Sequence, residues 1–210
     1  MTYNSDCEPL HAKCSIRDAM MHQSLGLLNE IKNLPEQKMK ASPRDQLIEE
    51  LAEKYSINIP VVNDLAPSAA THEVDIDVSR DPRRSFMGGG PATAKGTEIT
   101  ISVSYTGDKE VFRMHAGSHT MDYPLARLGD ATIMFSWRGS NLDSVQVRKE
   151  FDSKIVAINQ HLQGMRAELG NFNDTLKTEA ASAITARFDK LKRDDDLLGG
   201  LGFGGPKGSP

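Results

Sequence analysis

Cysteine is scarce in this sequence, and long apolar runs are absent from it. The two cysteines, Cys7 and Cys14, lie near the N-terminus and cannot cross-link the rest of the chain, which is typical of a reducing compartment. No run reaches the roughly 18 apolar residues of a membrane-spanning helix, and the N-terminus has no apolar signal segment. We therefore expect a cytoplasmic protein that does not enter a membrane.

Aromatic residues make up only 6% of the chain, and a positive charge excess is also missing. The formal net charge of −4 argues against a surface that binds nucleic acid throughout, although local basic patches remain compatible with it. A chain of 210 residues can still bury a core in one domain, with or without a helical appendage.

Motifs of nucleotide-binding and hydrolytic enzymes are also absent. No G-x-S-x-G nucleophile motif occurs. The glycine-rich segment 85–105 places Lys95 before Gly96 and leads into an alternating pattern, whereas a phosphate-binding loop needs G-x-x-x-x-G-K-[ST] before a helix. We interpret this segment as a connection, with a phosphate site as the alternative. We expect a non-catalytic protein without a cofactor.

Two groups of residues could hold a metal ion. Cys7, His11 and Cys14 form C-x3-H-x2-C, which lacks the fourth ligand of a tetrahedral zinc site. Asp75 and Asp77, next to Glu73, could form a cation site, but acidic side chains on the outer face of a strand usually face water. We expect no metal site in either place.

A cluster of arginines is the best candidate for anion binding. Arg80, Arg83 and Arg84 follow a predicted strand, and their guanidinium groups could bind phosphate or carboxylate through paired hydrogen bonds. The loop 115–122 carries two histidines and an aspartate, and loops often carry function. An enzyme or nucleotide-binding protein that uses both groups is the alternative function. Solvated surface charge is the simpler interpretation.

The hydrophobic periodicity predicts an α+β fold. Helical spacing indicates one helix at 15–33 and a second from Ser42, the predicted N-cap, to residue 55. Alternation then predicts strands at 72–80 and 129–139, and a β-hairpin at 98–115 that turns at Gly107. We expect two N-terminal helices and a small, mainly antiparallel sheet, followed by a long C-terminal helix or helical hairpin.

The last third of the chain has the clearest pattern. Its apolar residues are spaced alternately by four and three positions, the a/d pattern of a coiled coil. We call this set the helix seam: Phe151, Ile155, Ile158, Leu162, Met165, Leu169, Phe172 and Leu176. The seam is a candidate interface for self-association or for a partner. In the alternative interpretation, the helix covers the apolar face of its own sheet.

The continuity of this helix depends on Gly170. Because the spacing continues through Gly170, we predict one helix of about 45 residues, with a helical hairpin as the alternative. The predicted organisation is a flexible segment at 1–14, an α+β domain at 15–140, the helix at 141–193 and a flexible, glycine-rich tail at 194–210.

The C-terminal half resembles a poorly characterised bacterial module. The resemblance covers about residues 74–203 and includes the upstream segment GTEITISVSYTGDKEVFRMHAGSHTMDYPLARL. In the helical part it is carried by Glu150, Phe151, Asp152, Arg166, Phe172, Asn173, Leu176, Ile184, Arg187, Leu191, Leu201, Gly202 and Phe203. In relatives, this module precedes Toll/interleukin-receptor-type or nuclease-like effector domains in proteins suspected of defence against phage.

The resemblance implies a role for this chain, which ends shortly after Phe203 without such a domain. We expect a stand-alone interaction or sensor module, an accessory component of a bacterial defence system. Its partners would be a second copy of itself or a separately encoded effector.

Overall fold

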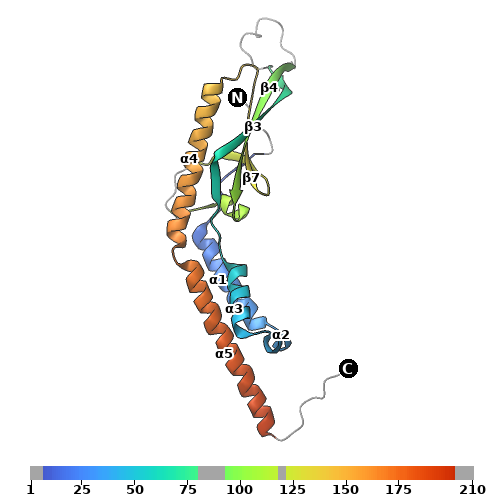
Figure 1. Ribbon diagram of the computed structural model, residues 1–210, viewed down its shortest axis with the longest axis vertical. Coiled ribbons are helices and arrows are strands. Elements are labelled where there is room, and N and C mark those ends of the chain that lie inside the picture. Colours follow the sequence, from blue (N-terminus) through green and yellow to red (C-terminus); the bar gives the residue numbers. More distant parts are fainter. Residues whose placement is uncertain (1–6, 80–92, 118–121, 202–210) are drawn as a thin grey trace, which may run out of the picture. The chain divides into compact units, whose positions relative to one another are not determined.

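The computed structural model describes residues 7–79, 93–117 and 122–201, and its fold is α+β, as predicted (Figure 1). The chain divides into two compact units. Met1–Ile16 and Asn58–Glu168 form the first unit, and Arg17–Ile57 and Leu169–Pro210 form the second. This division differs from the predicted one, because the N-terminal helices group with the end of the chain rather than with the sheet.

The first unit contains a five-stranded antiparallel sheet. Its strands lie in the order β1 (Glu8–Pro9), β6 (Leu125–Leu128), β7 (Thr132–Gly139), β4 (Thr93–Thr106) and β3 (Val61–Asp77). A separate parallel pair joins β2 (Cys14–Ser15) to β5 (Met114–His115). The mainly antiparallel sheet is therefore confirmed, and β3 is one of its two edge strands.

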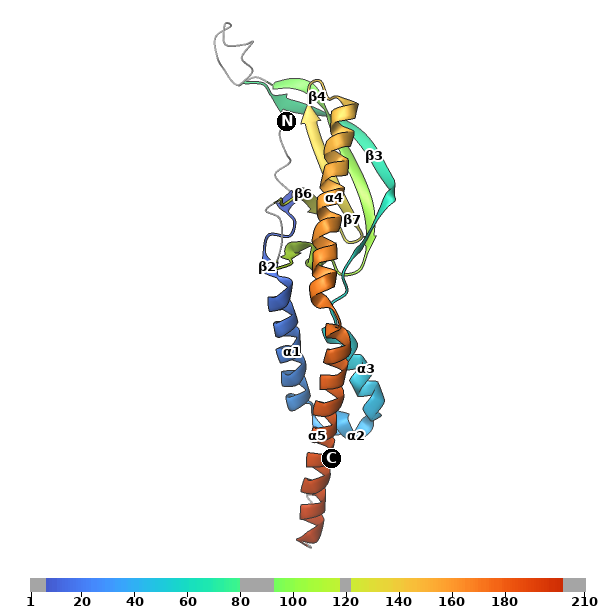
Figure 2. The same cartoon turned by 90° about the vertical axis from the view of Figure 1, so that its left-hand side faces the viewer.

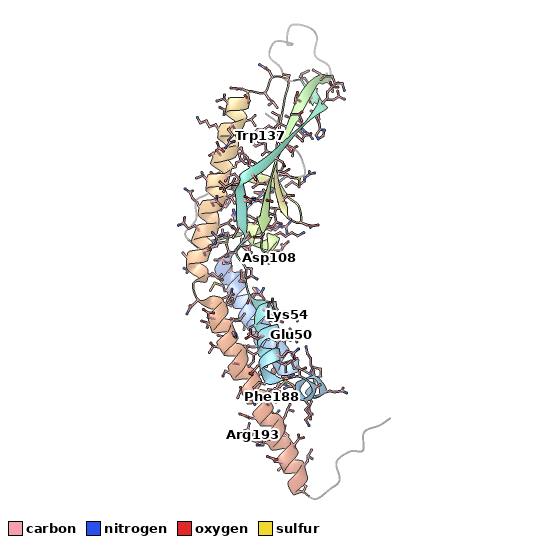
Figure 3. All side chains as sticks on the ribbon, viewed as in Figure 1. Glu50, Lys54, Asp108, Trp137, Phe188 and Arg193 are labelled. Carbon is pink, nitrogen blue, oxygen red and sulfur yellow. The ribbon has the colours of Figure 1, made fainter. Side chains whose placement is uncertain are left out.

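Helix α4 (Ser144–Leu169) covers one face of this sheet (Figures 1 and 2). The rings of Phe135 on β7 and Phe151 on α4 meet edge to face, with their centroids 5.7 Å apart. Trp137 on β7 is 1% exposed (Figure 3), and its Nε1–H donates to the carboxylate of Glu150 on α4 over 2.8 Å. The apolar face of α4 is thus used inside its own unit.

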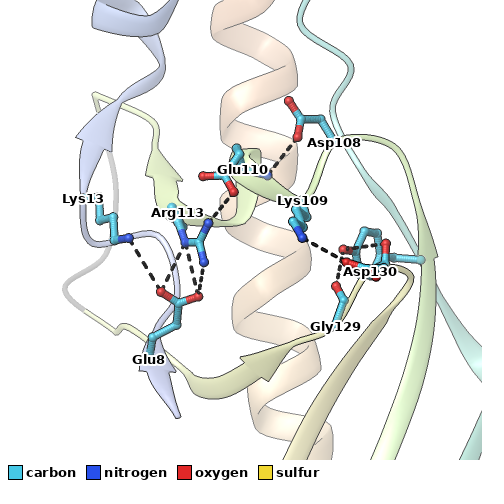
Figure 4. Close-up of polar contacts among 9 residues, drawn as sticks. Glu8, Lys13, Asp108, Lys109, Glu110, Arg113, Gly129 and Asp130 are labelled. Carbon is cyan, nitrogen blue, oxygen red and sulfur yellow. Dashed lines mark hydrogen bonds and ion pairs between the residues drawn. The ribbon is translucent and has the colours of Figure 1, made fainter. Parts of the chain in front are cut away.

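The predicted hairpin at 98–115 is wrong in its second half. After Gly107, which has a φ of 99°, the chain forms a 3-10 helix, η2 (Lys109–Arg113). The Asp108 carboxylate accepts from the N–H of Glu110 at the start of this helix, and the Arg113 guanidinium binds Glu8 (Figure 4). The strands that flank β4 are therefore β3 and β7.

Residues 8–9 and 14–15 form strands, which contradicts the predicted flexible segment for that part of the chain. Glu8 and Pro9 pair with β6, and Cys14 and Ser15 pair with β5. The carboxylate of Glu8 contacts Arg113 over 2.7 Å and Lys13 over 3.7 Å (Figure 4), so the segment is also held by ion pairs.

The second unit is helical. It contains most of α1 (Ile16–Asn33), with α2 (Glu36–Ala41), α3 (Arg44–Tyr55) and α5 (Phe172–Gly200). Its core is formed by Leu27, Ile31, Leu47, Leu51, Leu176, Ala180 and Ile184. Asn173 on α5 exchanges two hydrogen bonds of 3.1 Å with the backbone of Ile57. Arg44 lies 5.1 Å from the ring centroid of Phe188, which Figure 3 shows on α5.

The predicted helix 15–33 corresponds to α1, whereas other helix boundaries differ from the prediction. Helix α3 begins at Arg44 after Pro43, so Ser42 is not its N-cap. Helix α2 lies between the two predicted helices, in a segment for which no helix was predicted. Helix α5 continues to Gly200, which contradicts a flexible tail from residue 194.

The C-terminal helix is interrupted where its continuity was predicted. Helix α4 ends at Leu169, and α5 begins at Phe172. Gly170 between them has a φ of 48°, in the left-handed region that commonly ends a helix. The predicted long C-terminal helix is therefore present, but it is divided at Gly170 into α4 and α5 rather than continuous.

Candidate functional site

The helix seam is buried within the chain. Phe151 and Ile155 are 2% and 6% exposed, and Ile158, Leu162 and Met165 are fully buried in the first unit. In the second unit, Phe172 is 8% exposed and Leu176 is fully buried, while Leu169 is partly exposed. The seam is therefore core rather than a free interface, and the alternative interpretation, a helix that covers its own sheet, describes α4.

The residues of the C-x3-H-x2-C motif do not converge on one point. His11 is fully buried, whereas Cys14 is exposed. The His11 ring stacks on the ring of His161 from α4, with the centroids 4.5 Å apart and the planes 15° from parallel. Among the residues that the structure describes, no three His, Cys, Asp or Glu side chains are placed to hold a metal ion.

The two stacked imidazoles anchor backbone carbonyls. His11 Nδ1 lies 2.7 Å from the carbonyl oxygen of Met114, and His161 Nε2 lies 2.9 Å from that of Asp122. Because a carbonyl only accepts, each of these nitrogens carries a proton. Burial lowers the pKa of His11 to about 4, with smaller contributions from His161 and His115, against the effect of the Met114 hydrogen bond. The pair is thus suited to hold the N-terminal segment with His11 neutral.

The other candidate residues lie partly outside the described part of the chain. Arg80, Arg83 and Arg84 lie outside the described residues, as does the centre of the loop 115–122. Asp75 is paired with Lys95 on the neighbouring strand over 3.0 Å. The alternative function, which uses the arginine cluster and the histidine loop, therefore remains a prediction.

A cleft that the sequence did not reveal lies between α4 and the start of β6. Its volume is about 410 Å³, and it is lined by Asp122, Tyr123, Pro124, Leu125, Glu150, Ser153 and Lys154. This size falls within the range of small-molecule sites. Burial lowers the pKa of the Lys154 ammonium, and the carboxylates of Glu150 and Asp122 oppose that shift. The cleft therefore combines one cation, two carboxylates and an aromatic ring.

Glu150 connects this cleft to the core of the sheet. One carboxylate oxygen accepts from Trp137 Nε1–H, and the other accepts from the Gln146 amide over 2.9 Å. These hydrogen bonds from Gln146 and Trp137 lower the pKa of Glu150. Its charge is therefore held in place by a buried indole.

The edge strand β3 offers a different kind of site. All of Val61–Asp77 is strand, although the alternating pattern predicted a strand only from residue 72. Fourteen of its seventeen residues are exposed, and no strand of the described chain pairs with its outer edge. Between Asn63 and Ser68 the register with β4 shifts, and Leu65 in this bulge is 93% exposed.

The register shows which backbone groups of β3 point outward. Tyr105 on β4 donates its N–H to the carbonyl of Ala131, on the side of β7. Because the backbone groups of successive residues point to opposite sides of a strand, odd-numbered residues of β4 form hydrogen bonds with β7 and even-numbered residues with β3. The even-numbered residues of β4 lie opposite even-numbered residues of β3, as Thr100 lies opposite Ala70, so these β3 residues form the hydrogen bonds between the two strands. The N–H and C=O groups at positions 69, 71, 73 and 75 therefore point away from the sheet.

The outward edge is acidic. Asp64, Glu73 and Asp75 lie along β3, and Lys95 is the cation that contacts Glu73 and Asp75, over 3.4 Å and 3.0 Å. At least half of each of these three paired side chains is exposed, so the ion pairs remain open to solvent.

Comparisons with protein-family models, with curated proteins and with solved structures find no match to this chain. Among the described residues, no helix is both long enough and apolar enough to cross a membrane.

Proposed function

We propose that this chain is a protein-interaction module that binds an extended segment of a partner along β3. The observation that carries the proposal is the open edge of a seventeen-residue strand, with its outward N–H and C=O groups at alternate positions. Such an edge is a template for an added strand, because main-chain hydrogen bonds supply affinity without a deep pocket.

The negative charge of the β3 edge favours a partner segment with positively charged side chains. Opposite charges on directly opposed residues stabilise a strand pair, and like charges destabilise it. Glu73 and Asp75 project to the same face of β3, so we propose a partner segment that carries lysine or arginine at alternate positions. The acidic edge also disfavours pairing with the same strand of a second copy.

The identity of the partner follows from the resemblance alone. We propose a separately encoded effector protein, in keeping with the effector domains that follow this module in its relatives. We also propose a role in bacterial defence, which rests on the same resemblance. A phage-challenge assay with and without the gene would test it.

A matched pair of substitutions at Thr71 tests the edge. The probe is a short synthetic peptide that alternates lysine and valine, and its binding is followed by fluorescence anisotropy. Thr71→Pro removes an outward N–H, which an edge strand tolerates, and we expect binding to weaken about tenfold or more. Thr71→Ala keeps the N–H, so we expect it to bind like the unaltered protein.

The same experiment separates strand addition from simple charge attraction. Thr71→Pro leaves the charge of the edge unchanged, so a purely electrostatic contact would bind both variants equally. Equal binding by both variants, or no binding of the peptide to the unaltered protein, would remove β3 as the docking edge.

The cleft at Lys154 favours a second function, the binding of a small ligand that carries both an anionic and a cationic group. The anionic group could pair with the Lys154 ammonium and the cationic group with the Asp122 carboxylate, and Tyr123 adds an aromatic wall. A thermal-shift screen with amino acids and other small zwitterions tests this, because a ligand of the folded state raises the melting temperature. The shift should disappear in Lys154→Met.

A further inference from the structure

Helix α1 has two apolar faces, and its own unit covers only one of them. Leu27 and Ile31 are 0% and 2% exposed and belong to the core of the second unit. Met21, Leu25 and Leu28 are 56%, 59% and 42% exposed. Their spacing of four and three positions places these three side chains on one side of the helix, and we call them the α1 stripe.

The charges beside the α1 stripe are self-complementary. Asp18 lies seven positions before Leu25, and Lys32 lies seven positions after it. Two turns of helix separate each charge from Leu25, so both charges lie on the side of the stripe. In an antiparallel pair of α1 helices centred on Leu25, Asp18 of each copy would lie beside Lys32 of the other.

We propose that the α1 stripe is the surface on which a second copy of this chain docks, with the two α1 helices antiparallel. The arrangement is a closed, two-fold contact in which each helix supplies the same residues. It buries the three exposed apolar side chains of each copy and forms the Asp18–Lys32 contact twice. Arg17, which also borders the stripe, already has an interaction within its own chain.

The size of the contact sets its strength. Three apolar side chains from each helix bury less than the roughly 1,200 Å² of a standard interface, so the dimer is weak and dissociates on dilution. This surface belongs to the helical unit, whereas the proposed partner edge β3 belongs to the other unit. The two proposals can therefore fail independently.

Sedimentation velocity of the full chain over a concentration series tests the dimer. We expect a dimer that dissociates on dilution in the unaltered protein and a monomer for Leu25→Asp. Val156 on α4 is 55% exposed, so Val156→Asp adds the same charge at a similarly exposed site and should leave the dimer intact. Circular dichroism checks that both variants remain folded.

A charge-exchange series tests the antiparallel register. Asp18→Lys and Lys32→Asp should each weaken the dimer several-fold, because each places like charges in contact, and the double variant should recover most of the loss. A monomer at every concentration, or no recovery in the double variant, would overturn the proposal. Association that survives Leu25→Asp but disappears in Thr71→Pro would also overturn it and assign the contact to β3.

Discussion

A buried pair of imidazoles links the N-terminal segment to helix α4. His11 has a φ of 60°, in a region that histidine enters more readily than most residues, and its ring lies flat against that of His161. His11 Nε2 is buried without a hydrogen-bond partner among the described residues. Protonation would place a charge on a buried ring whose Nε2–H has no acceptor among the described residues.

The lowered pKa of His11 predicts a loss of stability in acid. The unfolded chain takes up this proton near pH 6.5, whereas the folded chain takes it up near pH 4. The free energy of unfolding is therefore not reduced by His11 above pH 6.5. It falls by about 3 kcal/mol as the pH decreases to about 4, because the unfolded chain binds the proton more readily. Denaturant unfolding at several pH values in this window measures the loss.

A substitution of His11 tests whether this residue causes the loss of stability in acid. His11→Asn keeps a side chain that accepts a positive φ but removes the imidazole, so the unfolding free energy should vary less with pH in this window. His22 on α1 is exposed, and His22→Asn should retain the pH dependence of the unaltered protein. An unchanged slope in His11→Asn would show that other groups cause the acid loss.

The sequence could not reveal this histidine pair. His11 and His161 come from opposite ends of the first unit, and nothing in the local pattern around either residue indicates its partner. The C-x3-H-x2-C spacing drew attention to His11 only as a possible zinc ligand. Candidate sites that depend on tertiary contacts, including the cleft at Lys154, have no local signal of this kind.

At the scale of elements, strands were predictable where one face is buried. Val74 and Ile76 are partly buried and alternate with exposed Asp75, so this part of β3 shows the expected period of two. Residues 63–73 of β3 are exposed on both faces and show no alternation. In η2, Val111 and Phe112 are adjacent and both buried, which a half-buried strand cannot achieve.

An unbroken helix was preferred over a break at Gly170 because the seam keeps its spacing across the glycine. Each helix has its own core to fill, so apolar residues continue on both sides of the turn. The better signal was the glycine itself, which commonly follows the end of a helix in a left-handed conformation.

Gly170→Ala should therefore destabilise the protein by about 1 kcal/mol, because a side chain at positive φ is strained. Gly199, near the end of α5, offers a matched control, since a Cβ there would contact nothing within 4 Å. Gly199→Ala should not lower stability, because alanine is the better helix former. Denaturant unfolding compares the two variants, and equal stability would show that Gly170 tolerates a side chain.

At the scale of the whole molecule, the two units have separate cores. Ile158 is fully buried in the first unit, and Leu51 is fully buried in the second. The chain passes between the units at three points: after Ile16, after Ile57 and after Glu168. Because each unit buries its own apolar side chains, each can lose structure as a cooperative segment.

Cavity-forming substitutions in the two cores should therefore act locally. Leu51→Ala removes buried methyl groups at a cost of about 3 kcal/mol, and we expect faster amide exchange in α1, α3 and α5. The protection of β4 and β7 should change much less. Ile158→Ala should reverse this pattern, with faster exchange in the sheet and α4 than in α1 and α3. Mass spectrometry after hydrogen exchange resolves these segments, and equal loss of protection in both units for either variant would show one cooperative core.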